Sequence, residues 1–329
     1  MYILDISKMK PGDILLTTQS VTQSKVIRKA TDSDYSHAML YVRHGGYIHS
    51  DSNGVHSGNV QRLIFEHINQ AKVLRVENCQ PDVIEKACEY ARSKIGTQYS
   101  VPQAVKSTIY RNTKNSGNPN RQFCSRLVAQ SYAYGGMPIT KNSDYCYPED
   151  LACSPRVHEV PNCLRPALPE ELEFAVSENP LERQATITNY ILTEARNIFG
   201  TDIQNFEQIT YELLRSPDKD QSICAAFISS GYLDIWKIDL NKNKWRYDEA
   251  EFLAVQVSAP KLRELAADEL VSAREQNDQF SKMLHFYHMH LQSHDLKYIR
   301  LNIELYFRLV QLTQKRIRAA IHVLNLNNT

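Results

Sequence analysis

The sequence predicts an α+β domain with an antiparallel sheet over residues 1–165, followed by a mainly α-helical domain over residues 166–329. Three observations predict this. The 329 residues exceed a typical single hydrophobic core, which favours two domains. Strand-like segments and turn signals dominate the first half, whereas helical periodicity with few breakers dominates the second. Between the halves lies a cluster of prolines, at Pro155, Pro161, Pro166 and Pro169.

The expected strands are short apolar runs next to turn signals. Pro11-Gly12-Asp13 is a turn signal before the strand 14–16, and residues 37–42 form the next predicted strand. Residues 44–46 can reverse the chain into a strand over 47–50, which gives a hairpin. A second turn, Asn53-Gly54, and a strand candidate at 72–76 follow.

Two helices are expected in the first domain. Residues 82–95 carry apolar residues at helical spacing between an Asp82 cap and a Gly96 stop. Residues 111–121 are polar and rich in turn formers, so we expect a loop that acts as a lid. The pattern is helical again from Cys124 to about 134, which places Cys124 at a helix start.

The second half is expected to be helical over 170–199, 203–215, 249–276 and 279–325. One interruption, near 231–247, has the pattern of a small β-hairpin. Its acids, Asp234 and Asp239, then lie on the exposed face, and its tryptophans, Trp236 and Trp245, pair across the strands as structural residues. We interpret 296–325 as a core helix with basic residues near its end rather than as a membrane-surface helix.

The composition excludes several classes of protein. A net charge of +1, from 38 Lys and Arg against 37 Asp and Glu, leaves no basic excess for nucleic acid. No run approaches the roughly 18 uncharged apolar residues of a transmembrane segment, and the N-terminus lacks the features of a signal peptide. An odd number of cysteines without CxxC spacing favours reduced thiols and a cytoplasmic protein. These cysteines are residues 79, 88, 124, 146, 153, 163 and 224.

Histidines and one cysteine are the candidate functional residues. A helix N-terminus and a neighbouring imidazole both lower a thiol pKa, so Cys124 with His37 on a facing strand is a candidate nucleophile and base. On spacing alone, a buried structural cysteine is the commoner interpretation. A second cluster, with the i, i+4 metal-ligand spacing at 290 and 294, is interpreted as solvated or packed, and no metal or cofactor is expected. It consists of His285, His288, His290 and His294.

Five segments that occur in the same order along the chain favour a catalytic Cys124 over a structural one. The chain resembles the circularly permuted branch of the NlpC-like papain-fold hydrolases, namely the YiiX-like and, more distantly, the lecithin:retinol-acyltransferase-like families. The segments that carry this resemblance are PGDILL at 11–16, IRKATDSDYSH at 27–37, YIHS at 47–50 with Gly54-Val55, FCSRLV at 123–128, and YPEDLA at 147–152 with Ser154-Pro155.

The resemblance implies a papain-like fold with Cys124 as nucleophile and His37 as general base and then acid. It also implies a third polar residue on the following strand, here His49, where YiiX-like proteins commonly have Glu and the acyltransferase-like group has His. Asp51 and Glu149 are substitutes for it. A three-residue reversal leaves 37 and 49 on one sheet face but roughly 13 Å apart unless a bulge or twist intervenes, whereas a two-residue reversal puts them on opposite faces.

The expected function is a thiol hydrolase or acyltransferase that cleaves an amide or ester bond through an acyl-enzyme, with a peptidase or amidase favoured. Its substrate is then a peptide or an acyl lipid, and the backbone N–H of Cys124 contributes to the oxyanion hole. Two alternatives stay open: a lipid acyltransferase or phospholipase at a membrane surface, and a non-catalytic binding module. The helical domain resembles no family known to us and is a candidate surface for a protein partner or a homodimer.

Overall fold

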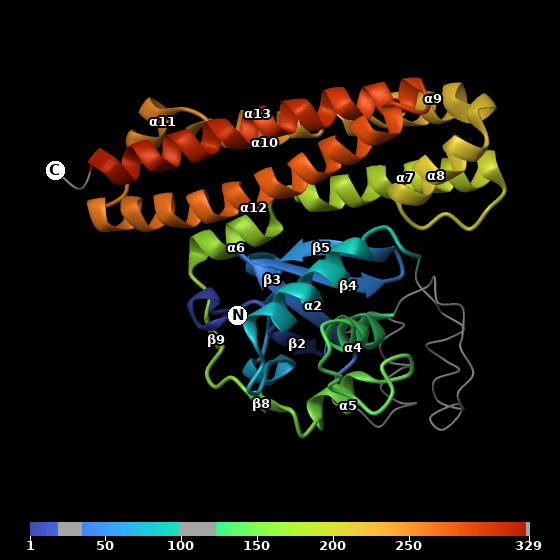
Figure 1. Cartoon of the computed structure of the whole chain (residues 1–329). Helices are drawn as coiled ribbons and strands as arrows, with labels where there is room; N and C mark the ends of the chain where they lie inside the picture. The colour runs from blue at the N-terminus through green and yellow to red at the C-terminus, as the bar shows by residue number, and fades with distance from the viewer. Residues whose placement is uncertain (19–34, 99–122, 327–329) are drawn as a thin grey trace. The chain divides into compact units, whose positions relative to one another are not determined.

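The computed structural model describes residues 1–18, 35–98 and 123–326. Its internal contacts divide the chain into two compact units, Met1–Ala185 and Thr186–Thr329. The predicted lid at 111–121 and most of the predicted segment 27–37 lie outside the described residues. Figure 1 shows the elements of both units.

The first unit is built on a six-stranded antiparallel sheet in the order β5-β4-β3-β2-β7-β8. A smaller sheet has the order β6-β1-β9. The α+β prediction is therefore confirmed. The strands are β1 (Tyr2–Leu4), β2 (Ile14–Thr17), β3 (His37–Arg43), β4 (Gly46–Asp51), β5 (Gly54–Asn59), β6 (Ile64–Phe65), β7 (Ala71–Val76), β8 (Val157–Glu159) and β9 (Leu164–Pro166).

Both faces of the large sheet are buried, because alternate residues of each strand face different cores. Ile14 and Leu40 pack with the helices α2 (Pro81–Ser93) and α4 (Cys124–Tyr134). Leu15 and Met39 belong to a second core that includes residues of the small sheet. Short 3₁₀ helices η1 (Ile6–Lys8), η2 (Val60–Arg62) and η3 (Ile68–Gln70) and the helices α5 (Pro148–Ala152) and α6 (Pro169–Val176) complete the unit.

Helix α4 begins and ends where the sequence indicates. Phe123 is extended at its N-cap, and the first backbone hydrogen bond of the helix runs from Leu127 N–H to Phe123 C=O. Gly135 and Gly136 end it, the latter with a φ of 90°. The Tyr132 hydroxyl donates to the carbonyl of Gly12 in the turn before β2, so α4 is held against the sheet.

The hairpin between β3 and β4 has a two-residue turn and an irregularity in register. Arg43 pairs with Gly46, but Tyr41 pairs with Tyr47, so Val42 is the extra residue of a bulge. With the two-residue turn alone, residues 37 and 49 would lie on opposite faces of the sheet. The extra residue shifts the pairing by one position, so that they lie on the same face. Met39 is then directly opposite His49, and His37 lies only two residues away from Met39.

The second unit is helical among its described residues, and it includes most of α7. Its helices are α7 (Pro180–Phe199), α8 (Phe206–Arg215), α9 (Asp220–Ser230), α10 (Trp236–Lys242), α11 (Glu249–Leu253), α12 (Ala259–Leu291) and α13 (Lys297–Leu326), with 3₁₀ turns η4 (Pro217–Lys219), η5 (Tyr232–Asp234) and η6 (Lys244–Arg246). The predicted break near 277–278 is wrong. Helix α12 runs through it, and the chain breaks at 292–296 instead.

The predicted hairpin near 231–247 is also wrong, because η5, α10 and η6 occupy this segment. A short, densely apolar run fits a helix as well as a strand, and periodicity alone does not separate the two. Trp236 Nε1 donates to the Leu233 carbonyl within this helical segment, and the Trp245 ring packs 4.9 Å from Phe252 rather than across a hairpin.

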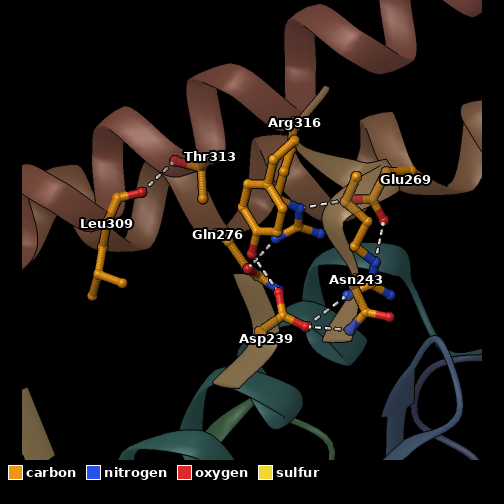
Figure 2. A network of polar contacts seen from close by, with 9 residues as sticks. Asp239, Asn243, Glu269, Gln276, Leu309, Thr313 and Arg316 are labelled. Atoms are coloured by element: carbon orange, nitrogen blue, oxygen red, sulfur yellow. Dashed lines mark hydrogen bonds and ion pairs between the residues drawn. The ribbon is translucent and has the colours of Figure 1, made fainter. Parts of the chain in front are cut away.

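A polar network in the second unit links α12 and α13 (Figure 2). Arg316 Nε donates to Glu269 Oε1 at 2.5 Å, and its Nη1 donates to Gln276 Oε1 at 2.6 Å. Both charged side chains are almost fully buried, at 4% and 5% exposure. Asp239, expected on an exposed hairpin face, instead accepts from Asn243 at 2.6 Å and from the Tyr247 hydroxyl.

No helix in the described ranges is long and apolar enough to cross a membrane.

Candidate active site

Cys124 is the first residue of α4 and is 6% exposed. Its position at a helix N-terminus favours the thiolate, but burial raises the pKa of the Cys124 thiol. Hydrogen bonds from the backbone of Ala38 and Ser125 lower the pKa of the thiol, but by less than burial raises it. The resting side chain is therefore a neutral thiol near neutral pH.

His37 is the first residue of β3, immediately before Ala38. Its Nε2 lies 2.7 Å from Nδ1 of His49, and the two rings meet edge to face. Burial lowers the pKa of His37 to about 4, although the Asp51 carboxylate acts in the opposite direction. His37 is therefore a neutral imidazole near neutral pH and is able to accept a proton.

The structure brings His37 and His49 together more closely than the hairpin argument predicts. The separation of roughly 13 Å assumes a three-residue reversal. The two-residue turn and the bulge at Val42 instead make His37 a diagonal neighbour of His49, within side-chain reach. His49 is buried, with 9% exposure, and burial together with the neighbouring His37 and His56 lowers its pKa.

His37 and Cys124 are neighbours through the backbone but are not hydrogen bonded to each other among the described residues. The sulfur contacts the backbone of Ala38, whose side chain lies in the same core as Cys124. His49 is directly opposite Met39, which belongs to the other core. His37 thus lies at the start of β3, one residue before the strand position that the sulfur contacts, and strand alternation places it on the face of Met39 rather than on that of Ala38.

Asp51 and His56 extend the histidine pair along the sheet. His56 is directly opposite His49 in the β4–β5 pair, with ring centroids 4.2 Å apart. Its Nε2 lies 3.1 Å from Asp51 Oδ1, but this contact does not have good hydrogen-bond geometry. Burial lowers the pKa of His56, but the Asp51 carboxylate more than offsets this, so the pKa is raised.

His56 has no place in the sequence interpretation. The Asn53-Gly54 signal indicates a turn before β5, but it does not fix the register that makes Asp51 pair with Gly54 and His49 with His56. Ligand atoms of His49, Asp51 and His56 all lie within 4.8 Å of one another.

Other sequence candidates lie elsewhere. Glu149 is on α5, where it accepts a hydrogen bond from Cys153 Sγ at 3.1 Å. In the helical unit, the His290 ring packs 4.6 Å from Phe286 and 6.0 Å from Tyr211.

An open pocket of about 690 Å³ lies in the first unit beside the start of α4. The residue that connects the two is Cys146, which lines the pocket and whose carbonyl accepts from Ser125 Oγ at 2.7 Å. Lys141 and Arg156 supply positive charge to the lining, and Asp150 supplies negative charge.

One family model matches residues that lie within the first unit. Residues 8–147 match the family model described as a permuted papain-like amidase enzyme, YaeF/YiiX, of the C92 family. A solved structure titled metalloprotein yiiX, from Escherichia coli O157:H7, is 21% identical, with a TM-score of 0.38 and coverage of 46% of this chain and 97% of that chain. No curated protein matches the chain.

Proposed function

Because residues 8–147 form a YiiX-like permuted papain-fold domain, we propose that Cys124 is the nucleophile of a cysteine amidase and His37 its general base. The family is one of amidases, which supports a thiol-hydrolase role for this domain. The single observation that carries the residue assignment is the position of Cys124. Its sulfur lies at the start of α4 against the backbone of Ala38, and the residue before Ala38 in the chain is His37, a half-buried histidine that contacts His49.

The reaction begins from a neutral pair, since burial disfavours both the thiolate and the imidazolium. His37 Nε2 is occupied by His49, so Nδ1 is the nitrogen that accepts the thiol proton as the sulfur attacks the carbonyl carbon. This requires His37 to donate from Nε2 to His49 Nδ1. Loose contacts between nucleophile and base are common in substrate-free active sites and tighten when substrate binds.

The remaining steps follow from the same groups. The Cys124 backbone N–H has no acceptor within the first turn of α4, so it is available to stabilise the oxyanion. His37 then donates its proton to the departing amine, which leaves an acyl group on the sulfur. Water, deprotonated by His37, releases the acid. His49 is a positioning residue, because it acts through His37.

The pocket beside Cys146 is our candidate for the acyl or peptide part of the substrate. The seven cysteines, none of them in a disulfide, support the proposal of a reducing, cytoplasmic environment. For the helical unit we propose substrate selection or partner docking.

The test is the labelling of the full chain with a limiting thiol-directed electrophile, with the modified cysteine mapped by mass spectrometry. The exposed Cys153 is replaced by serine in every variant, so that accessibility alone does not dominate the result. Cys88 is the matched control, since it is also buried in the same unit. We expect preferential labelling of Cys124 that His37→Ala reduces.

Labelling of Cys124 no faster than that of Cys88, or unchanged by His37→Ala, would contradict the proposal. Either result would favour the binding-module alternative.

A further inference from the structure

We propose that His49, Asp51 and His56 form a binding site for a divalent cation of the zinc class, and that its occupation switches off His37 as a base. The binding part stands on geometry alone, whereas the inhibitory part rests on the proposed function. The sheet register presents the three side chains side by side on one face. His49 and His56 are directly opposite each other, and Asp51 follows His49 by two residues on the same strand.

The donor set suits a borderline cation. Two imidazoles and one carboxylate are the three protein ligands found in many zinc sites, with a water molecule as the fourth. In a tetrahedral site with bonds of about 2.0 Å, ligand atoms are about 3.3 Å apart. Asp51 Oδ1 and His56 Nε2 are already 3.1 Å apart, and all three ligand atoms lie within 4.8 Å. Closing the site requires separations of up to 4.8 Å to shorten by about 1.5 Å to the tetrahedral value.

The burial of these residues fits an ion that enters from solvent. The Asp51 and His56 side chains are 34% and 20% exposed, whereas His49 is 9% exposed and is the most buried of the three ligands. His56 Nε2 is itself a buried atom without a hydrogen-bond acceptor of good geometry. An ion at this position would satisfy that nitrogen and the Asp51 charge together.

The hydrogen bond between His49 and His37 determines how a bound ion would affect His37. His49 Nδ1 is engaged with His37, so His49 must bind the ion through Nε2. An imidazole with its Nε2 lone pair on a metal carries its proton on Nδ1 and donates it to the group beyond, here His37 Nε2. His37 then carries its own proton on Nδ1, the nitrogen that the reaction needs free. Occupation therefore reverses the direction of this hydrogen bond.

The binding test uses the full chain after removal of metals with a chelator. Cobalt(II) is the spectroscopic probe and zinc the calorimetric ligand, with magnesium as a hard-cation control. We expect one saturable cobalt site without thiolate-to-cobalt charge-transfer absorption, also present in Cys124→Ser. His56→Asn and Asp51→Asn should each weaken it at least tenfold. The matched control, His290→Asn, removes a histidine from the helical unit and should leave it unchanged.

Thiolate absorption from the bound cobalt, or equal binding by wild type and His56→Asn, would overturn the site. If His56→Asn fails to fold, Asp51→Asn, which keeps the side-chain volume, still tests the site. The circular dichroism of each variant is compared with that of the wild type.

The inhibition test measures Cys124 labelling with and without zinc, each variant against its own metal-free rate. We expect zinc to slow labelling at least tenfold in wild type and much less in His56→Asn. Histidine-dependent binding that leaves the labelling rate unchanged would overturn the inhibitory part alone. If metal-free Cys124 is no more reactive than Cys88 while cobalt binds as described, the proposed function fails and the cation site stands.

Discussion

Replacing His49 by leucine removes the 2.7 Å hydrogen bond to His37 Nε2, in which His49 is buried and His37 half-buried. A buried polar group left without a partner costs about 1–3 kcal/mol. If that cost is felt when His37 takes the thiol proton, the rate of Cys124 modification falls roughly 5- to 150-fold. His49→Gln keeps a side-chain amide that can hydrogen bond to His37, so it should recover most of the rate.

The assay is the second-order rate of Cys124 labelling in chelator-treated protein, followed by intact mass in the Cys153→Ser background. The control is Met39→Leu, a volume-conserving change directly opposite His49 that removes no hydrogen bond. A wild-type rate in His49→Leu would refute the reasoning. So would an equal loss in His49→Leu and His49→Gln, since that pattern reports packing rather than a hydrogen bond.

Three further predictions concern pH, packing and backbone conformation. Burial lowers the pKa of His37 from 6.5 to about 4, so the rate of Cys124 labelling should persist in acid and fall only near pH 4, and a decline centred near pH 6.5 would contradict this. The unfolded chain binds this proton more readily than the folded chain, so the free energy of unfolding should also decrease as the pH falls from 6.5 towards 4. Arg316→Met should leave the buried Glu269 with only its 3.5 Å contact to Arg246, and Glu269→Met should leave the buried Arg316 without the carboxylate it contacts at 2.5 Å. Each single variant should therefore cost up to about 3–5 kcal/mol in denaturant unfolding. The double variant should cost much less than the sum, and additive losses would count against this coupling. Gly54 has a φ of 92°, and a Cβ added there would lie 2.6 Å from a backbone oxygen, so Gly54→Ala should lower stability by at least about 1 kcal/mol. The loss should exceed that of Gly136→Ala, because Gly136 has a similar φ of 90° but open space around it. Equal losses in the two variants would show that the contact at residue 54 is relieved.

The sequence predicts local structure well where chain signals are local. The turn at Pro11-Gly12-Asp13 does precede β2, and β3, β4 and β7 lie close to their expected bounds. Helix α2 begins at Pro81, one residue before the expected start. These elements depend on turn residues, caps and short apolar runs that are visible in the chain itself.

Register and tertiary context could not be predicted in the same way. The bulge at Val42 has no signature in composition, yet it decides that His37 meets His49. His56 joins the cluster only through the β4–β5 register. In the second unit, the run after Gly231 is helical, and the Trp236 indole donates to the Leu233 carbonyl within it. Such choices depend on contacts between segments that a single sequence does not reveal.

The proposed reaction depends on an acyl-enzyme at Cys124 formed with His37 as base. Its most direct test is rapid quenching of the metal-free full chain with an activated amide substrate, followed by peptide mapping of the acyl group. We expect an adduct on Cys124 that is absent in Cys124→Ser and accumulates more slowly in His37→Ala. An adduct distributed equally over Cys124 and Cys88, or one formed at the same rate without His37, would contradict it.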